Sequence, residues 1–425
     1  MKKLYCFSCI ISLFLLVSCD KANIKNVKDS KLYTEPVMEE TVQNEENHHL
    51  EVWTFSDIFQ NSLPSFQEKY PDLDIEIKVI DKSRVVNMYL DSLVAESTPD
   101  LFVIPDDQLG TFLGIGGLEN LLSESYYDEQ FLSKRPEGLL DEYIHDDEMV
   151  TMPLLFFPYV TFYRKDILEQ YGYPHDPISL SNYISESDHW LRMARTLAED
   201  GYYIAESEQM LIETALRTSN FFESDYNYIL DKSPFNDTVK TAVSVSEEKL
   251  SPYLNIWDDR GKEALANNQL VMIYMGSFVT EQLMNWLPEQ KGKWGVTTLP
   301  FDLAGIDRKA SMSIAISSNS PNKEIAWEFV KHMSNDMLKM YQQPITNPYF
   351  INDNLQSIYW KALEKNNPGK PNILDREVRL IWELALKDYQ NGEKVTDYSV
   401  NHLHEDVMES IRQDQEALKN LNPAD

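Results

Sequence analysis

The chain has 425 residues, of which 43% are hydrophobic, and its formal net charge is −31. A chain of this length is too long for one ordinary hydrophobic core, so we expect two lobes. A charge this negative repels the phosphates of nucleic acids and the headgroups of anionic lipids, which excludes both as direct ligands. It is compatible with neutral or cationic ligands.

The first residues are predicted to be a targeting segment. Lys2 and Lys3 form a basic start, and residues 4–17 are apolar but shorter than the roughly 20 residues of a membrane-spanning helix. The run ends in Leu16-Val17-Ser18-Cys19, which resembles the lipobox of bacterial lipoproteins. That resemblance implies that residues 1–18 are removed and that Cys19 carries a diacylglycerol, so the protein is expected at the cell membrane, facing the extracellular or periplasmic side. An ordinary secretory signal with an unrelated cysteine is the alternative.

The segment after the leader has the composition of a tether. Residues 19–49 are rich in Lys, Asn, Glu and Val and have few aromatic side chains, so they cannot bury enough surface to offset the entropy of ordering. Cys6 and Cys9 lie in the leader, so cleavage leaves Cys19 alone and no disulfide or cysteine metal site is expected. The pair His48-His49 is expected to be solvated.

The globular part begins with an alternation of strands and helices. Short apolar or alternating runs predict strands, and runs with helical spacing predict helices between them. Strand, helix, strand, helix, strand is typical of a parallel sheet with crossover helices. The predicted elements are, in order, 51–55, 58–70, 75–79, 85–96 and 99–104.

The second half of the chain repeats some of these signals. Residues 270–275 and 314–316 are short and apolar and are predicted to be buried strands. Ser320-Pro321 has the residue types of a helix start, with serine as N-cap and proline in the first turn. The residues from 348 onwards are predicted to be helical. The helix after Ser320 is expected to bury Ile325, Phe329, Val330, Met333 and Met337.

Four segments resemble, in this order, the extracellular solute-binding protein family 1, and especially its maltose-binding-protein-like members. They are LEVWTFSDIFQNSLPSFQEKYPDLDIEIKVI from residue 50, TPDLFVIPDDQLGTFLGIGGLENL from residue 98, MPLLFFPYVTFYRKDILEQYGYP from residue 152, and NNQLVMIYMGSFV, KGKWGVTTLP and SMSIAISSNSPNKEIAWEFVKHM from residue 267. The family's Tyr-Asn-Lys-Asp is replaced by Tyr163-Arg164-Lys165-Asp166, and its Gly-Pro-Trp by Gly276-Ser277-Phe278. These departures bear on the ligand more than on the fold.

The resemblance implies an α/β, two-lobed, type II periplasmic-binding-protein-like fold, with a mostly parallel sheet flanked by helices in each lobe and a hinge between them. It implies a monomeric, lipid-anchored receptor that binds a mono- or oligosaccharide between the lobes and delivers it to the permease of an ABC importer, without catalysis or a cofactor. The expected division assigns 50–158 and 306–345 to the N-terminal lobe and 159–305 and 346–425 to the C-terminal lobe.

Candidate ligand-binding residues follow the predicted strands, because ligands of open α/β sheets bind beyond the carboxyl ends of strands. Asp, Gln and aromatic side chains at such places suit sugar hydroxyls and the apolar faces of sugar rings. By the resemblance, Asp57, Asp107 and Gln108 fall on binding positions and Trp382 lies in the region of a stacking tryptophan. The alternatives are that the acidic pair caps a helix, and that the aromatic residues are core, as we expect for Trp53. The full candidate set is Phe55, Asp57, Asp106, Asp107, Gln108, Phe157, Tyr159, Gly276, Phe278 and Trp382.

Two other functions stay open on the sequence alone. A receptor for a polyamine or another cationic solute would share the fold and would use the same carboxylates. A surface glycoside hydrolase needs two carboxylates about 5–10 Å apart across a scissile bond, whereas Asp106-Asp107 and Asp146-Asp147 are adjacent in sequence and suit caps or loops better. No zinc helix, phosphate loop or nucleophile elbow is present, and His402 and His404 point apart on a helix, so no metal site is predicted.

Overall fold

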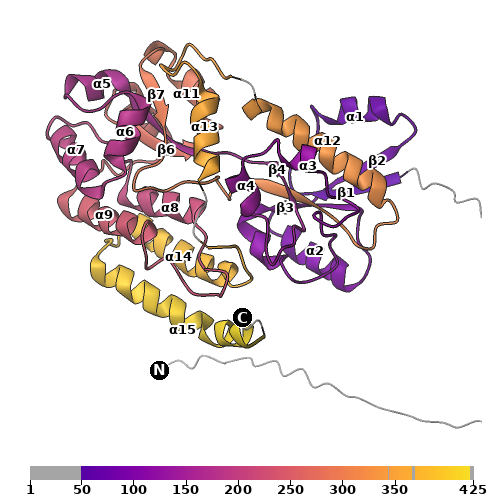
Figure 1. Ribbon diagram of the computed structural model, residues 1–425. Coiled ribbons are helices and arrows are strands. Elements are labelled where there is room, and N and C mark those ends of the chain that lie inside the picture. Colours follow the sequence, from indigo (N-terminus) through magenta and orange to yellow (C-terminus); the bar gives the residue numbers. More distant parts are fainter. Residues whose placement is uncertain (1–48, 343, 366–368, 422–425) are drawn as a thin grey trace, which may run out of the picture. The chain divides into compact units, whose positions relative to one another are not determined.

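Two separate β-sheets organise the part of the chain described by the computed structural model, which comprises residues 49–342, 344–365 and 369–421. These described residues all belong to one compact unit (Figure 1). The predicted leader, the lipidation site Cys19 and the tether up to residue 48 lie outside the described residues. None of the helices found among the described residues has the length and apolar character needed to cross a membrane.

The first sheet has the strand order β2-β1-β3-β8-β4. β1 (His49–Thr54) is parallel to both β2 (Asp74–Val79) and β3 (Leu101–Pro105), as the alternating pattern predicts. α1 (Leu63–Lys69) and α2 (Val85–Val94) form the crossovers between these strands. β8 (Met312–Ile316) returns from much later in the chain and pairs antiparallel with β3 and with β4 (Met152–Leu155).

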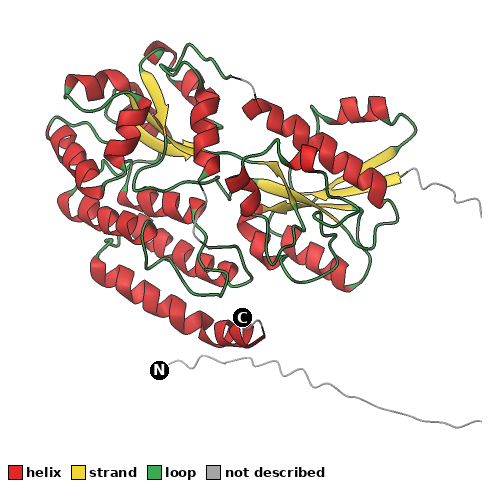
Figure 2. Cartoon of the chain, viewed as in Figure 1, coloured by secondary structure: helices red, strands yellow, loops and turns green. Residues whose placement is uncertain are grey.

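The second sheet corrects the prediction of a mostly parallel sheet in each lobe. β5 (Tyr159–Arg164) lies between β6 (Met272–Gly276) and β7 (Trp294–Thr297), and both pairings are antiparallel (Figure 2). The strands run in opposite directions because of the path of the chain. β5 leaves the first sheet through the short crossing segment 156–158 and runs away from it, whereas β6 and β7 follow helical segments and run back towards that crossing.

Helices make up most of the remaining chain. The predicted helix start at Ser320-Pro321 lies just ahead of α12, which begins at Lys323, and Ser320 Oγ accepts the Asn322 amide at 3.0 Å. The other elements are the 3-10 helices η1 (Asp106–Thr111) and η2 (Pro288–Gln290), and the α-helices α3 (Glu129–Leu132), α4 (Glu137–Asp141), α5 (Lys165–Gln170), α6 (Pro177–Ile184), α7 (Ser187–Glu199), α8 (Glu208–Thr218), α9 (Phe235–Glu248), α10 (Asp259–Ala266), α11 (Val279–Trp286), α12 (Lys323–Gln342), α13 (Leu355–Glu364), α14 (Asp375–Gln390) and α15 (Asp397–Leu421).

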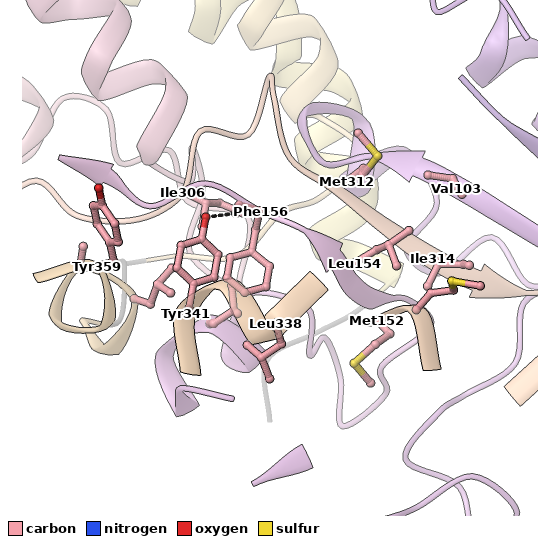
Figure 3. Close-up of a cluster of buried hydrophobic side chains, with 14 of the residues drawn as sticks. Val103, Met152, Leu154, Phe156, Ile306, Met312, Ile314, Leu338, Tyr341 and Tyr359 are labelled. Atoms are coloured by element: carbon pink, nitrogen blue, oxygen red, sulfur yellow. Dashed lines mark hydrogen bonds between the residues drawn. The ribbon is translucent and has the colours of Figure 1, made fainter. Parts of the chain in front are cut away.

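An apolar core continues from one sheet to the other along the crossing segment (Figure 3). The Tyr341 ring, near the end of α12, stacks on Phe156 with centroids 5.3 Å apart, and its hydroxyl donates to the Phe156 carbonyl at 2.8 Å. The same hydroxyl lies 3.0 Å from Ser277 Oγ, just beyond β6. Tyr341 therefore connects the crossing segment to the end of β6 in the second sheet. The predicted core residues Phe329, Val330 and Met333 on α12 are fully buried.

Two glycines allow backbone to pack directly on backbone where η1 and α4 meet the C-terminal helices. A Cβ at Gly110 would lie 2.1 Å from the Asn372 carbonyl oxygen, just before α14. A Cβ at Gly138 would lie 2.6 Å from the Glu364 carbonyl oxygen, at the end of α13. Because neither approach leaves room for a side chain, η1 is held close against the start of α14, and the candidate site lies at this contact.

Candidate ligand-binding site

The acidic pair at the end of β3 does not act as a helix cap. Pro105 precedes η1, and the N-terminus of η1 has no side-chain capping hydrogen bond. The Asp106 carboxylate turns inward instead, is 3% exposed, and accepts the Tyr143 hydroxyl proton at 2.6 Å. Oδ1 of Asp107 is buried without a hydrogen-bond partner among the described residues, whereas the Ser313 hydroxyl lies close enough to the Asp106 carboxylate to act on it as a donor.

These two aspartates belong to a buried charged cluster. Arg308 reaches it from the segment between β7 and β8, and α14 contributes the other members from its first turns. Together the side chains surround a cavity of about 10 Å³, with Asn220 and Phe221 from the segment after α8. We use "buried charged cluster" for Asp106, Asp107, Arg308, Asp375 and Arg379.

The two arginines of the buried charged cluster are held differently. Arg308 Nη2 binds the Glu142 carboxylate and donates to Asn220 Oδ1 at 2.7 Å. Arg379 lies over the Phe221 ring, with its guanidinium carbon 4.8 Å from the ring centroid. Nε of both arginines and Nη1 of Arg379 are buried and have no acceptor within the described part of the chain. The buried charged cluster therefore offers both donors and acceptors.

Burial raises the carboxyl pKa values of the buried charged cluster. Desolvation raises the pKa of Asp106 to about 7, against the opposing hydrogen bond from Tyr143. It raises the pKa of Asp375 to about 7, against the hydrogen bond from the Asn372 amide. The pKa of Asp107 is raised by burial as well, and the nearby charge of Arg379 opposes that shift. Charged groups without partners in such an environment are costly.

Buried polar atoms without partners are rare in folded proteins, and an ordered water, an ion or a polar ligand can complete them. The cavity of about 10 Å³ holds at most one water molecule, whereas small-molecule sites typically measure about 300–1,000 Å³. A ligand can enter only if η1 and the start of α14 separate. In the present arrangement η1 and the start of α14 therefore leave no sugar-sized space between them.

An aromatic row begins at the crossing segment, passes the N-terminus of α11 and ends in the loop before α10. The Phe157 and Phe278 rings meet edge to face with centroids 5.2 Å apart, and Phe278 is stacked with Trp257 at 6.5 Å and an interplanar angle of 21°. Gly276, at the end of β6, is required here because a Cβ would lie 2.5 Å from the Phe278 ring. We use "aromatic row" for Phe157, Phe278 and Trp257.

Ser311 connects the aromatic row to the buried charged cluster. Its side-chain oxygen accepts the Phe157 amide at 3.2 Å, and its carbonyl accepts the Asp106 amide at 3.2 Å. The segment that holds Ser311 also provides Arg308. The buried charged cluster therefore lies close to the crossing segment, and the aromatic row starts from the same segment.

The structure brings together several of the predicted residues. Asp106, Asp107, Phe157, Gly276 and Phe278 take part in the arrangement just described. Phe55 lies beside it, with Lys82 Nζ over its ring at 5.4 Å while the same ammonium donates to the Lys309 carbonyl. Gln108 is half-buried in η1.

Three predicted residues lie elsewhere. Tyr159 is completely buried in the core beneath the second sheet, because it faces inward at the start of β5. Trp382 is also fully buried, packs edge to face on Phe235 and donates its indole proton to Tyr228 at 3.2 Å. Asp57 is exposed and accepts from Gln60 at 2.6 Å. Tyr159 and Trp382 belong to the core of the second sheet and do not line the buried charged cluster, so their contact with a ligand stays a prediction.

Trp53 is half-buried in β1 and packs, as expected, on an apolar cluster between the first sheet and α2, with its ring centroid 6.1 Å from those of Tyr89 and Phe102. The part that stays exposed lies next to Lys78, whose Nζ is 4.2 Å from the ring centroid.

Sequence reasoning missed several members of the candidate site. Arg308 and Asn220 lie in connecting segments, and Trp257 lies in a loop, so no periodic pattern distinguishes them. Asp375 and Arg379 are on the same helix as Trp382, and the helical pattern indicates spacing but not which residues face a neighbouring lobe. The exposure of a tryptophan, 45% for Trp257, is visible only in the structure.

The histidine-rich positions show no metal-binding geometry. His49 lies 3.0 Å from an Asp74 carboxylate oxygen, and His404 Nδ1 lies 3.0 Å from the Tyr228 hydroxyl. Over the residues that can be described, no group of three or more His, Cys, Asp or Glu side chains is placed to hold a metal ion.

Comparison with known proteins identifies the family. The family model of the bacterial extracellular solute-binding proteins matches residues 53–339, which span both sheets and most of the candidate site. The chain belongs to this family. An arabinooligosaccharide-binding protein of Halalkalibacterium halodurans is 23% identical over an alignment of 308 residues. The match covers 66% of this chain and 66% of that protein, just under two thirds of its length.

Solved structures of solute-binding proteins share the fold. The sugar-binding protein MalE from Xanthomonas citri superposes with a TM-score of 0.67 at 17% identity, covering 87% of this chain and 99% of the other. The galacto-N-biose-/lacto-N-biose I-binding protein of the ABC transporter from Bifidobacterium longum, in complex with lacto-N-biose, gives a TM-score of 0.64 at 14% identity, covering 85% and 97%. The expected two-lobed type II fold is confirmed.

Proposed function

We propose that this solute-binding protein is the carbohydrate receptor of an ABC importer. The observation that carries the proposal is the adjacency of the buried charged cluster, which has unpartnered donors and acceptors, and an aromatic row. Hydroxyls at the edge of a sugar need charged or polar partners, and the C–H faces of its rings need aromatic surfaces. The relative named for arabino-oligosaccharides supports the same ligand class.

A binding role without catalysis fits the family, whose members are binding proteins. The proposed lobes are those expected from the sequence, with residues 50–158 and 306–345 in one and 159–305 and 346–425 in the other. A ligand that contacts η1 on the first and α14 on the second would favour a closed arrangement through its differential affinity for the two states. The proposed receptor works as a monomer and hands its sugar to the permease subunits.

A thermal-shift screen tests the ligand class. The full chain, purified in mild detergent, is heated with arabinose, arabino-oligosaccharides, maltose and maltopentaose, and in parallel with spermidine. A ligand that binds only the folded state raises the free energy of unfolding, by about 2.7 kcal/mol at a concentration 100 times its Kd. The melting temperature rises as a result. We expect a rise with at least one sugar. A rise with spermidine alone would favour the cationic solute instead.

We also propose that Cys19 carries the lipid anchor, on the basis of the Leu16-Val17-Ser18-Cys19 motif behind a basic, apolar leader. Replacing Cys19 by serine removes the thiol that would be acylated, so the protein should move from the membrane fraction to the soluble fraction. Cell fractionation and immunoblotting measure this. Cys6→Ser, a change within the leader, is the matched control and should leave the protein with the membrane. Retention of the Cys19 variant on the membrane would contradict the anchor.

A further inference from the structure

Trp257 is presented to solvent by a loop that is firmly held. The indole is 45% exposed, although large aromatic side chains are usually mostly buried. Beneath it, the Glu206 carboxylate accepts the Ile256 amide at 2.8 Å, and the Glu206 carbonyl accepts the Leu254 amide at 2.9 Å. Glu206 itself is 3% exposed. The loop is therefore tied to the protein interior on both sides of Asn255.

The start of α10 restrains the same loop from the other side. A Cβ at Gly261 would lie 1.9 Å from the Asn255 carbonyl oxygen, so the helix packs directly on the loop backbone. Asp258 caps α10 by accepting the Gly261 amide at 2.8 Å, and Asn255 Oδ1 accepts the Trp257 amide at 2.9 Å. Trp257 is thus an exposed ring in a fixed orientation, which lowers the entropic cost of binding.

Neighbouring side chains contact the Trp257 indole and leave part of it exposed. Trp286, at the end of α11, meets Trp257 edge to face with centroids 5.3 Å apart. Lys262 of α10 lies 5.3 Å from the Trp286 ring centroid and covers that ring. On the other side Trp257 continues the aromatic row through Phe278 to Phe157 at the crossing segment. The row runs from the buried charged cluster towards solvent.

We infer that Trp257 is an outer platform for the distal rings of an oligosaccharide, whose first sugar is bound at the buried charged cluster. This inference rests on the proposed function. The centroids of Phe157, Phe278 and Trp257 follow one another at 5.2 and 6.5 Å, and the apolar faces of ligands pack on aromatic side chains. A protein partner is a less suitable occupant, because the exposed ring is single, braced and continuous with the ligand site. The platform selects for ligand length rather than for the identity of the first sugar.

Isothermal titration calorimetry against ligand length tests the inference. The full chain in detergent is titrated with arabinose and with arabino-oligosaccharides up to the pentasaccharide, and with glucose and malto-oligosaccharides up to maltopentaose. Trp257→Ala should weaken binding of the longest bound oligosaccharide about 10-fold or more and leave the shortest bound sugar unchanged. Trp257→Phe should restore most of the loss. Tyr398→Ala, which removes an exposed aromatic ring on α15, is the matched control and should change neither.

The outcomes separate the two proposals. If the wild-type chain binds none of these sugars, the proposed function fails and the inference fails with it. If sugars bind and Trp257→Ala affects every length equally or none, the function stands and the outer platform is wrong. Gly261→Ala is a second variant, because it should displace the loop without altering the indole. It should reproduce the length-dependent loss of affinity, and full affinity for long ligands in that variant would contradict the role of the fixed loop.

Discussion

Replacing Asp107 by alanine is expected to weaken sugar binding about 10- to 150-fold. A hydrogen bond from a ligand hydroxyl to a carboxylate contributes roughly 1.5–3 kcal/mol, which corresponds to that range of affinities. Asp107 is placed for such a bond because its Oδ1 is buried without a partner among the described residues, next to Arg379. Calorimetric titration with the sugar that gives the largest thermal shift measures the loss.

A matched control distinguishes the loss of a ligand contact from a general effect of net charge. Asp388→Ala removes an exposed carboxylate from the far part of α14, so it lowers the net negative charge by the same amount outside the candidate site. Its affinity should equal that of the wild type. Equal losses in the two variants would indicate a general charge effect, and an unchanged affinity in correctly folded Asp107→Ala would remove Asp107 from the site.

Replacing Asp375 by asparagine is expected to stabilise the protein at neutral and alkaline pH. Burial raises the Asp375 pKa from 3.8 to about 7, so between these values the folded state retains a proton that the unfolded state releases. The wild-type free energy of unfolding therefore falls as pH rises from about 4 to about 7. Above pH 7 the folded state continues to bear the whole free-energy cost of the buried, ionised carboxylate. Asparagine cannot ionise, so the variant should gain on the order of 4 kcal/mol at pH 8, at about 1.4 kcal/mol per pKa unit, and little at pH 4.

Chemical denaturation at both pH values measures the effect. The Asp388→Asn variant, with the same change on the exposed side of α14, should show no such dependence. The gain at pH 8 should come with weaker sugar binding, since the asparagine replaces an acceptor oxygen that has no partner within the described residues. A variant that is destabilised at pH 8 would show that the Asp375 carboxylate is paired and ionised in the folded protein.

Local sequence patterns were sufficient to predict the strands and crossover helices at the start of the fold. The crossovers α1 and α2 and the parallel strands around β1 follow from residue spacing between 51 and 104, because each strand and helix shows its own period. The antiparallel second sheet could not be predicted in this way. The direction of β6 and β7 relative to β5 depends on the path of the helices between them, and no local period records that path.

The candidate site shows the same division. Asp106, Asp107 and Phe278 were predictable because they directly follow strands, where ligands of such sheets bind. Trp382 was predicted and Arg379 was not, although both lie on α14 and both are buried, one in the core and the other in the buried charged cluster. Arg379 became recognisable only when tertiary packing placed it over Phe221 and beside Asp107.

The measurement that tests the central claim most directly is a calorimetric titration of the wild-type chain with neutral arabino- and malto-oligosaccharides at low and high salt. We expect saturable binding of one sugar molecule per chain, with an affinity that changes little with salt because the ligand has no charge to screen. Binding of spermidine but of no sugar, with an affinity that falls steeply as the salt concentration rises, would contradict a carbohydrate receptor.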